Sequence, residues 1–371
     1  MGRRTLRALY SATLWLTLAC AGAPGTSGNP GFSEAIRQSS LMGPAEGPSP
    51  VPGKIFTSEQ PVASTLEADF HQLRKDRDQE SEERPARLVM VDAGGPEITI
   101  PLQVRTRGNF RLRGHVCSFP PLRLNFSTEG ARGTVFEGYD KLKLVGHCRN
   151  RDDYEQNVLE EYLAYRIYNF LTEVSFRVQL VLITYHDTAG EEDTVSRLGF
   201  LIEDEETMAH RVEGVSMEAT RASPANFVQQ QAGLMYVFQY LIGNTDWTIR
   251  RFHNVKLVRI GRDYYPVPYD FDFSGLVDAP YAGPNPVVGN RIMNVTERLF
   301  WGVCSEEIDY RAIFARFNEE REGIEELIQT QPGLTDSNAR KAWDFLESFY
   351  EVINSDPQAD RRILRECRGP P

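Results

Sequence analysis

The sequence predicts an α+β fold with a β-rich first part and a mainly helical second part. Between residues 84 and 145, short runs of apolar and β-branched residues alternate with Gly, Pro and Asp, which is typical of an antiparallel sheet. One long amphipathic helix follows, and then two more strands. Beyond these strands the periodicity is mainly helical. We therefore expect a β-rich part at residues 61–205 and a helical part at residues 206–371.

The composition is that of a folded protein with an acidic balance. Hydrophobic residues make up 41% of the 371 residues and aromatic residues 11%, which is ample for a packed core. The 41 basic and 52 acidic side chains leave a formal net charge of −11. This balance argues against a nucleic-acid partner, because phosphate contacts need clustered Lys and Arg.

Residues 1–23 have the pattern of an export signal peptide. Three arginines precede an apolar run from Ala8 to Ala19, and small residues follow. The run is too short to span a bilayer. Cys20 lies in a sequence close to a bacterial lipoprotein cleavage box, so lipid attachment at Cys20 and simple cleavage near Ala23 both stay open. Either outcome predicts an exported protein, secreted or held in the bacterial cell envelope as a lipoprotein.

The predicted strands begin after a flexible tether at residues 24–60, which is rich in Gly, Pro and Ser. The first four strands are ARLVMVDA, EITIPLQVRTRG, PLRLNF and KLKLVG. In the second of these, Arg105 and Arg107 share one face, and Gly108 allows the chain to turn. Two guanidinium groups beside a glycine could hold phosphates, although a solvated strand face explains them nearly as well.

The fourth strand and the helix that follows it carry further candidates. Lys141 and Lys143 share a strand face, and we favour Lys143 as a ligand of phosphate because it lies deeper between two leucines. The alternative is a surface lysine. An apolar stripe predicts a helix at about Asp153–Leu171. Glu160 and Glu161 lie on this helix, and either could pair with the lysine.

The remaining elements lead into the second part of the fold. Glu203 ends the later of two further strands, at the point where the chain crosses to the helical part. A helix that is apolar on nearly all sides, and therefore buried, ends just before Asp246. The expected strands are Phe176–Tyr185 and Val195–Glu203, and the expected helices are Ala232–Ile242, Glu306–Phe317 and Thr335–Ile353.

Residues 244–275 carry the most specific chemical pattern of the chain. A predicted β-hairpin is preceded by Asp246 and followed by Asp270 and Asp272. Its strands are expected at His253–Arg259 and Tyr264–Tyr269, with the turn at Gly261–Asp263. The period-2 spacing puts Asp270 and Asp272 on one face, and the hairpin brings them towards Asp246.

Aspartates in this arrangement, with Asn254 between them, suit phosphoryl transfer. One carboxylate, that of Asp246, accepts the proton of the attacking hydroxyl. The amide oxygen of Asn254 and a second carboxylate hold Mg²⁺ on the nucleotide phosphates. The alternative is that these residues only form turns and caps. His253 is expected to pack beside this loop, because Asp246 already supplies a base.

With these motifs, the chain resembles the CotH-like kinases, which are secreted or surface proteins with an atypical protein-kinase fold. The resemblance spans about residues 85–280 and covers an R-x-R-G-N element, an Asp-led catalytic segment with a downstream Asn, and a P-x-D-x-D metal segment. The matching residues are Arg105, Arg107, Gly108, Asn109, Asp246, Asn254, Pro268, Asp270 and Asp272. Tyr269 departs from the family, which commonly has tryptophan there. Eight positions separate Asp246 from Asn254, where ordinary protein kinases have about five.

The resemblance implies a bilobal protein-kinase-like fold that binds ATP with Mg²⁺ or Mn²⁺. It implies that Asp246 is the catalytic base and that the metal ligands are Asn254, Asp270 and Asp272. The expected nucleotide-binding residues are Lys143, Arg105, Arg107, Glu160 and Glu203. The implied reaction transfers phosphate to a hydroxyl, on Ser or Thr of a protein substrate. A G-x-G-x-x-G loop is missing from the sequence, so a standard kinase phosphate loop is not expected.

Two other functions are compatible with the same residues. One is a kinase-fold binding or assembly protein of the cell envelope without turnover, which the missing glycine loop and the scarcity of ATP outside the cytoplasm favour. The other is a metal-dependent hydrolase that uses the same aspartates. A serine hydrolase is disfavoured because no G-x-S-x-G motif is present.

Four cysteines remain when Cys20 is set aside, and an even number in an exported chain favours two disulfides. By position, we expect the pairs Cys117–Cys148 and Cys304–Cys367. The rival interpretation is a zinc site formed by His115, Cys117, His147 and Cys148. Because adjacent strand residues point to opposite faces, His147 and Cys148 are poorly placed to bind one ion.

Overall fold

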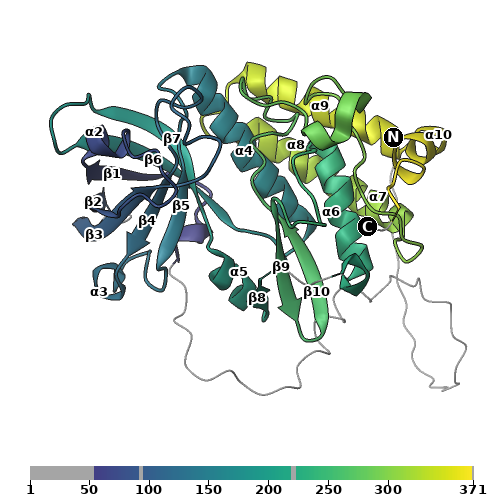
Figure 1. Cartoon of the computed structure of the whole chain (residues 1–371), viewed down its shortest axis with the longest axis horizontal. Coiled ribbons are helices and arrows are strands. Elements are labelled where there is room, and N and C mark those ends of the chain that lie inside the picture. The colour runs from purple at the N-terminus through teal and green to yellow at the C-terminus, as the bar shows by residue number, and fades with distance from the viewer. Residues whose placement is uncertain (1–53, 92–94, 219–222, 370–371) are drawn as a thin grey trace, which may run out of the picture. The chain divides into compact units, whose positions relative to one another are not determined.

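The computed structural model describes residues 54–91, 95–218 and 223–369, which belong to one compact unit, Glu46–Pro371. The fold is α+β, with a seven-stranded mixed β-barrel followed by a helical region (Figure 1). The predicted signal peptide, Cys20 and most of the predicted tether lie outside the described residues. The last part of that tether instead belongs to the fold, because Lys54–Thr57 forms a 3-10 turn whose Ile55 is buried in the barrel core.

The barrel closes in the order β1-β2-β3-β4-β5-β7-β6. Neighbouring strands are antiparallel except β1 and β6, which run parallel with Ser64 opposite Ile183. The prediction of an antiparallel sheet is therefore corrected to a closed, mixed sheet. β2 to β7 match the six predicted strands, whereas β1 was not predicted. The strands are β1 Val62–Ala68, β2 Arg84–Val91, β3 Glu97–Thr106, β4 Leu122–Phe126, β5 Lys141–Val145, β6 Val178–Asp187 and β7 Val195–Ile202.

Alternation along the strands builds the barrel core. Leu88 and Ile100 face each other across β2 and β3 and are buried, and Leu66 of β1 packs in the same cluster. On the outside of the barrel, Glu67 and Arg87, which are opposite each other in register, form an ion pair of 2.6 Å. Two short helices lie between strands of the barrel, α2 Phe70–Leu73 and α3 Thr128–Ala131.

Helix α4, Asp152–Leu171, lies between the barrel and the helical region (Figure 1). Its apolar residues belong to the large core cluster that also contains residues of β6, β7 and α6, so the helix is buried on most of its surface. Because α4 is packed between the two parts of the fold, its side chains contact both of them.

The helical region contains a buried helix, α6, several amphipathic helices and a small sheet of order β10-β9-β8. The predicted hairpin is confirmed, with Gly261 at φ +62° in its turn. Helix α7 begins later than predicted because Asp309 caps it through the Ala312 N–H. The elements are α5 Glu205–Arg211, β8 Val215–Met217, η2 Pro224–Asn226, α6 Gln229–Leu241, β9 Val255–Ile260, β10 Asp263–Pro268, η3 Pro286–Arg291, α7 Tyr310–Glu319, α8 Arg321–Thr330, α9 Asp336–Ile353, α10 Asp356–Ala359 and η4 Asp360–Leu364.

Both predicted disulfides, Cys117–Cys148 and Cys304–Cys367, are confirmed. The alternative zinc site is wrong, because its two cysteines are bonded to each other and the His147 ring stacks on Phe119 at 4.6 Å between centroids. Disulfides of this kind indicate an oxidising environment such as the cell exterior. Within the described ranges, no helix combines the length and the apolar character that a membrane span requires.

Candidate active site

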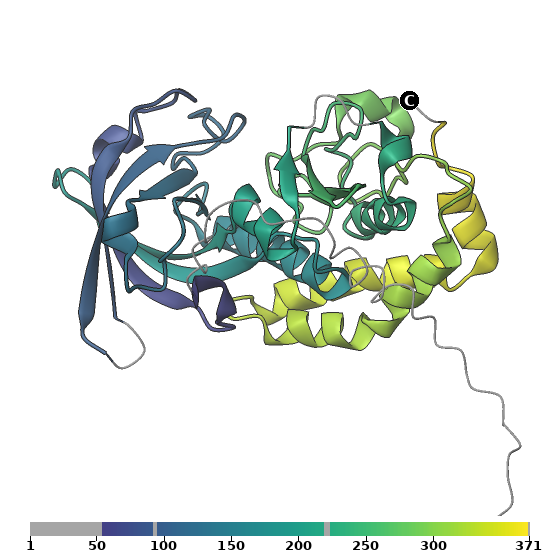
Figure 2. The same cartoon turned by 90° about the horizontal axis from the view of Figure 1, so that it is seen from below.

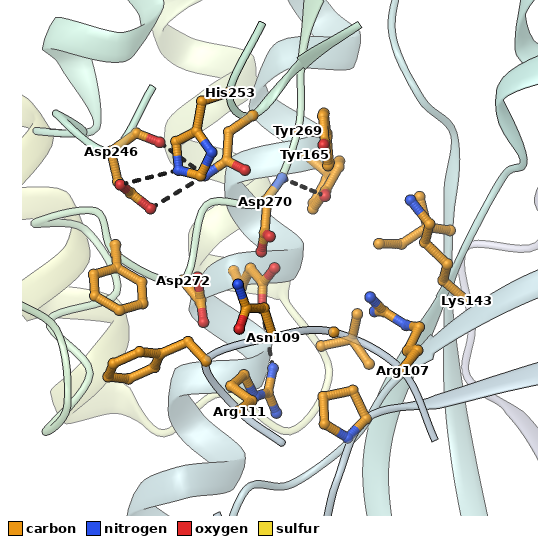
Figure 3. Close-up of a pocket in the computed structure, with 18 of the residues that line it drawn as sticks. Arg107, Asn109, Arg111, Lys143, Tyr165, Asp246, His253, Tyr269, Asp270 and Asp272 are labelled. Carbon is orange, nitrogen blue, oxygen red and sulfur yellow. Dashed lines mark hydrogen bonds and ion pairs between the residues drawn. The ribbon is translucent and has the colours of Figure 1, made fainter. Parts of the chain in front are cut away.

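A cavity of about 210 Å³ lies between the barrel and the helical region, and it brings together six of the nine predicted site residues (Figure 3). These six residues are Arg107, Lys143, Asp246, Asn254, Asp270 and Asp272. The barrel supplies the cations and the hairpin region supplies the carboxylates. Residues that are up to 165 positions apart in sequence thus meet in one site.

The loop that follows α6 presents Asp246. Trp247 is buried beside it and donates its indole N–H to Asn244 O at 3.0 Å, which fixes the course of the loop. Three side chains contact the Asp246 carboxylate. The Asn285 Nδ2 donates to Oδ1 at 3.0 Å, Asn254 Nδ2 donates to Oδ2 at 3.2 Å, and His253 Nε2 lies 3.3 Å from Oδ1. The carboxylate is therefore held in one orientation.

The Asn254 side chain is tied to both the backbone and the carboxylate of Asp246. Its Nδ2 also donates to Asp246 O at 2.7 Å, which leaves the amide oxygen as the side-chain atom able to bind a cation. Its φ of +53° lies in the left-handed region, which asparagine tolerates better than most residues. A residue held in such a conformation is more often found at functional sites than elsewhere.

Asp270 and Asp272 lie just past the end of β10 at Pro268, and both line the cavity as predicted, although strand alternation no longer holds at these positions. Asp270, at φ +64°, donates its backbone N–H to the Tyr165 hydroxyl at 2.8 Å and exposes its carboxylate in the cavity. Asp272 is buried and accepts a hydrogen bond of 3.0 Å from the Tyr281 hydroxyl. Burial, reinforced by the charge of Asp270, raises the pKa of Asp272 to about 7. Phe271 points the other way and contacts Tyr165 at 4.6 Å between ring centroids.

Three cations face these carboxylates (Figure 3). Arg107 donates its Nε to Leu122 O at 3.2 Å. Lys143 Nζ lies 5.1 Å above the centre of the Tyr269 ring, and no carboxylate of the described residues is within ion-pair distance of it. Burial, together with the charge of Arg107, lowers the pKa of Lys143 to about 8. An anionic ligand would strongly stabilise the charged form of this buried, unpaired ammonium group.

Arg111 is the third cation, and sequence analysis did not identify it. It donates Nη2 to Gly146 O at 2.7 Å, and its Nη1 lies 3.9 Å from Glu161 Oε2. Its Nε is buried without a hydrogen-bond partner in the described part of the chain. The disulfide between Cys117 and Cys148 anchors the loop that carries Arg107, Asn109 and Arg111 to the end of β5. Arg111 could have been identified in the sequence from the arginines between the R-G-N motif and Cys117.

The expected pair between Lys143 and an acidic residue of α4 is not present. Glu161 lines the cavity one helical turn before Tyr165, and it faces Arg111 instead of the lysine. Burial, with added repulsion from Asp272 and Asp270, raises the pKa of Glu161 well above its ordinary value.

Glu160 lies away from the cavity, because adjacent helical residues point about 100° apart. Its carboxylate accepts hydrogen bonds from Asn338 of α9 at 2.8 Å and from Asn157 at 3.1 Å. Glu160 therefore joins α4 to α9 and does not line the site.

Two further candidates also lie outside the cavity lining. Arg105 donates to the backbone oxygen of Gln79 at 2.7 Å. It is still in β3, whereas Arg107 lies past the end of the strand at Thr106, so strand alternation no longer keeps the two on one face. Glu203 is buried and accepts two hydrogen bonds from Arg211, at 3.0 and 2.9 Å.

The oxygen donors of the site fit a hard cation such as Mg²⁺. Among the described residues, no group of three or more His, Cys, Asp or Glu side chains is arranged to hold a metal by itself. Mg²⁺ commonly takes only one or two carboxylates and completes its coordination with phosphates and water. Asp270 and Asp272 are close enough to repel each other, and a divalent cation between them offsets that repulsion.

Comparison with known proteins adds no relative to this picture. No protein-family model matches the chain. No curated protein is significantly similar to it.

Proposed function

We propose that this protein is an exported, kinase-like phosphotransferase that uses ATP with Mg²⁺ or Mn²⁺ to phosphorylate a hydroxyl of a protein substrate. The observation that carries the proposal is the charge arrangement of one cavity: Asp270 and Asp272 on one side, and Arg107, Arg111 and Lys143 on the other. A polyphosphate with a bound cation matches both sides at once. The β-rich part, the long helix α4 beside it and the helical part also support a bilobal protein-kinase-like fold.

The cations substitute for the missing glycine-rich loop. Planar guanidinium groups bind phosphate oxygens in pairs, and Lys143 adds a point charge. The buried Nε of Arg111 and the unpaired Lys143 ammonium both gain an acceptor when phosphate binds. Val145, Phe176 and Ile202 line the same cavity and offer an apolar surface to a nucleobase.

Asp270, Asp272 and the amide oxygen of Asn254 would hold the divalent cation, which when bound neutralises charge on the transferred phosphoryl group. Asp246 has a different role. Its carboxylate is oriented by His253, Asn254 and Asn285 and accepts the proton of the acceptor hydroxyl. A base that is held in place before the substrate arrives needs little rearrangement during the transfer step.

The test is metal-dependent nucleotide binding, measured as the shift in melting temperature with ATP in the presence and absence of Mn²⁺ or Mg²⁺. The unchanged protein should be stabilised only when both are present. Asp270→Asn should lose this stabilisation, because the cation loses a ligand. Asp140→Asn is the matched control, since Asp140 is exposed and pairs only with Lys141. If neither metal ion with ATP changes the melting temperature, the proposal is wrong.

Binding without transfer to any protein or peptide would favour the envelope-binding alternative. Incorporation of radiolabelled phosphate from ATP into casein or a Ser/Thr peptide library decides between the two. Transfer that depends on Asp246 supports the enzyme. Nucleotide hydrolysis in the absence of any acceptor phosphorylation would instead support the metal-dependent hydrolase.

A further inference from the structure

The segment that follows the site, residues 285–293, is attached directly to the candidate base. Asn285 donates its Nδ2 to Asp246, donates its backbone N–H to Thr245 Oγ1 at 3.3 Å, and accepts the Val287 N–H at 3.0 Å. The same residue therefore orients the carboxylate and caps η3. A molecule that lies on η3 is thereby placed next to Asp246.

This segment presents apolar side chains to solvent. Val287 is 75% exposed and Met293 is 74% exposed, more than any other large hydrophobic residue described. Val288 and Ile292 are buried and anchor the segment to the large core cluster. A partner chain that covers Val287 and Met293 would remove their apolar surface from water, which favours its binding.

Arg291 of this segment and Arg368 lie over the Trp301 ring, and Arg250, four residues after Asp246, is near enough to Arg368 for the two charges to interact. The guanidinium carbon of Arg368 lies 3.9 Å from the centre of the Trp301 ring, and that of Arg291 lies 5.8 Å from it. Burial lowers the pKa of Arg368, and the nearby charges of Arg291 and Arg250 lower it further. The chain end that carries Arg368 returns to η3 at this face (Figure 2). We call Arg250, Arg291 and Arg368 the basic patch.

The basic patch is not neutralised from within the described residues. Arg291 pairs with Glu366, while Arg368 donates to the backbone oxygen of Trp301. Arg250 is exposed, and its guanidinium makes no hydrogen bond or ion pair within the described ranges. In a chain of net charge −11, three neighbouring arginines with one carboxylate partner leave a local surplus of positive charge. Such a surplus attracts an anionic partner.

We propose that residues 285–293 and the basic patch bind the acceptor as an extended acidic peptide segment. Acidic residues near the acceptor hydroxyl contact Arg250, and an apolar residue of the same segment contacts Val287 and Met293. This inference rests on the proposed phosphotransferase for its functional meaning, because it names the substrate class of that site. The binding itself requires no nucleotide and can be measured separately.

The test compares three fluorescent Ser peptides that share one Leu and differ only in flanking residues: Glu-rich, Gln-rich and Lys-rich. Fluorescence anisotropy with the full protein at low salt should show the Glu-rich peptide binding more tightly than the Gln-rich one, with the difference lost at high salt. Arg250→Gln should weaken the Glu-rich peptide about fivefold. Arg132→Gln is the matched control, because Arg132 is an exposed arginine of the barrel. Equal affinity for the three peptides overturns the proposal.

Charge reversal gives a test that loss of folding cannot imitate. Arg250→Glu should weaken the Glu-rich peptide and strengthen the Lys-rich peptide. A joint change of Val287→Ser and Met293→Ser should weaken all Leu-containing peptides and leave the charge preference in place. If Arg250→Glu leaves the preference for the Glu-rich peptide unchanged, the basic patch does not bind the acceptor.

The two proposals fail separately. If the protein binds no nucleotide but binds the Glu-rich peptide through Arg250, the peptide-binding surface stands, and the phosphotransferase, with the role of the peptide as its acceptor, is wrong. If phosphate is transferred equally well to Glu-rich and Lys-rich peptides, the phosphotransferase stands and the acceptor surface is wrong. Displacement of the Glu-rich peptide by an RNA oligonucleotide that binds more tightly would likewise overturn the peptide as occupant.

Discussion

Replacing Glu160 by glutamine should change how the stability of this protein depends on pH. Glu160 is 2% exposed and lies between α4 and α9. Burial raises its pKa from the ordinary 4.5 to about 7, although hydrogen bonds from Asn338 and Asn157 favour the charged form. Between these two pH values the native state keeps a proton that the unfolded state releases. The free energy of unfolding therefore falls as the pH rises through this window.

The size of the effect follows from the shift in pKa. Each unit of difference between folded and unfolded states corresponds to about 1.4 kcal/mol, so the stability lost between pH 4.5 and pH 7 is roughly 3 kcal/mol. Below pH 4.5 the carboxyl is protonated in both states and the loss is absent. Glutamine is neutral at every pH, but it offers one acceptor oxygen to the two amide groups that donate to separate carboxylate oxygens of Glu160, which adds a cost that does not change with pH. The stability of Glu160→Gln relative to the unchanged protein should therefore rise by roughly 3 kcal/mol between pH 4.5 and pH 7 and stay level outside this window.

The assay is unfolding by denaturant, followed by tryptophan fluorescence, at several values between pH 4.5 and pH 8 with both disulfides intact. The difference between the two proteins cancels the groups that titrate in both. Glu203→Gln is a matched control: Glu203 is also 2% exposed, but it pairs with Arg211, and its loss should destabilise the protein at neutral pH by roughly 3–5 kcal/mol. Parallel stability curves for Glu160→Gln and the unchanged protein would refute the reasoning.

Three further predictions concern the candidate active site. Asp246→Ala should abolish phosphate transfer in a radiolabel assay and leave ATP affinity, measured by calorimetry, nearly intact. Asp270→Ala should instead lose metal-dependent ATP binding itself. Similar behaviour of both variants would contradict the assigned roles. Cys117→Ser with Cys148→Ser should lower stability in thermal unfolding by about 2–5 kcal/mol and weaken ATP binding, because the loop that carries Arg107 and Arg111 is released. Unchanged ATP affinity would count against a role of that loop. Lys143, with a pKa of about 8, should react faster than surface lysines with an amine-acylating reagent at pH 8. ATP with Mn²⁺ should protect Lys143 from this reaction, as measured by peptide mass mapping. Absence of protection would remove Lys143 from the site.

Patterns that act over a few residues predicted most of the elements around the site. The hairpin at β9 and β10 follows from two apolar runs and a glycine turn. Asp270 and Asp272 share the cavity as predicted, but the bend after Pro268 brings them there, because strand alternation ends at that residue. The position of α4 follows from its apolar stripe. The disulfides followed from an even cysteine count and from proximity in sequence.

What could not be predicted depends on contacts between distant parts of the chain. Neither the choice between Glu160 and Glu161 nor the role of Arg111 is set by local pattern, because both depend on which element packs against each side of α4. Asn285 reaches Asp246 from 39 positions away, and nothing in its neighbourhood in sequence announces that contact. Strand β1 was missed because its partner for closure, β6, begins more than one hundred residues later.

The parallel pairing of β1 with β6 also dictates an order of assembly. β1 can form a hairpin-like pair with β2 early, but its other edge has no partner until residues 178–187 have been made and α4 has packed behind them. Until then, the free edges of β1 and β6 are open to pairing with other chains, a known route to aggregation. A chain that folds in an oxidising environment, as the two disulfides indicate, meets this hazard while its barrel is still an open sheet. Its folding yield should therefore depend on how fast the middle of the chain folds, more than on how stable the finished barrel is.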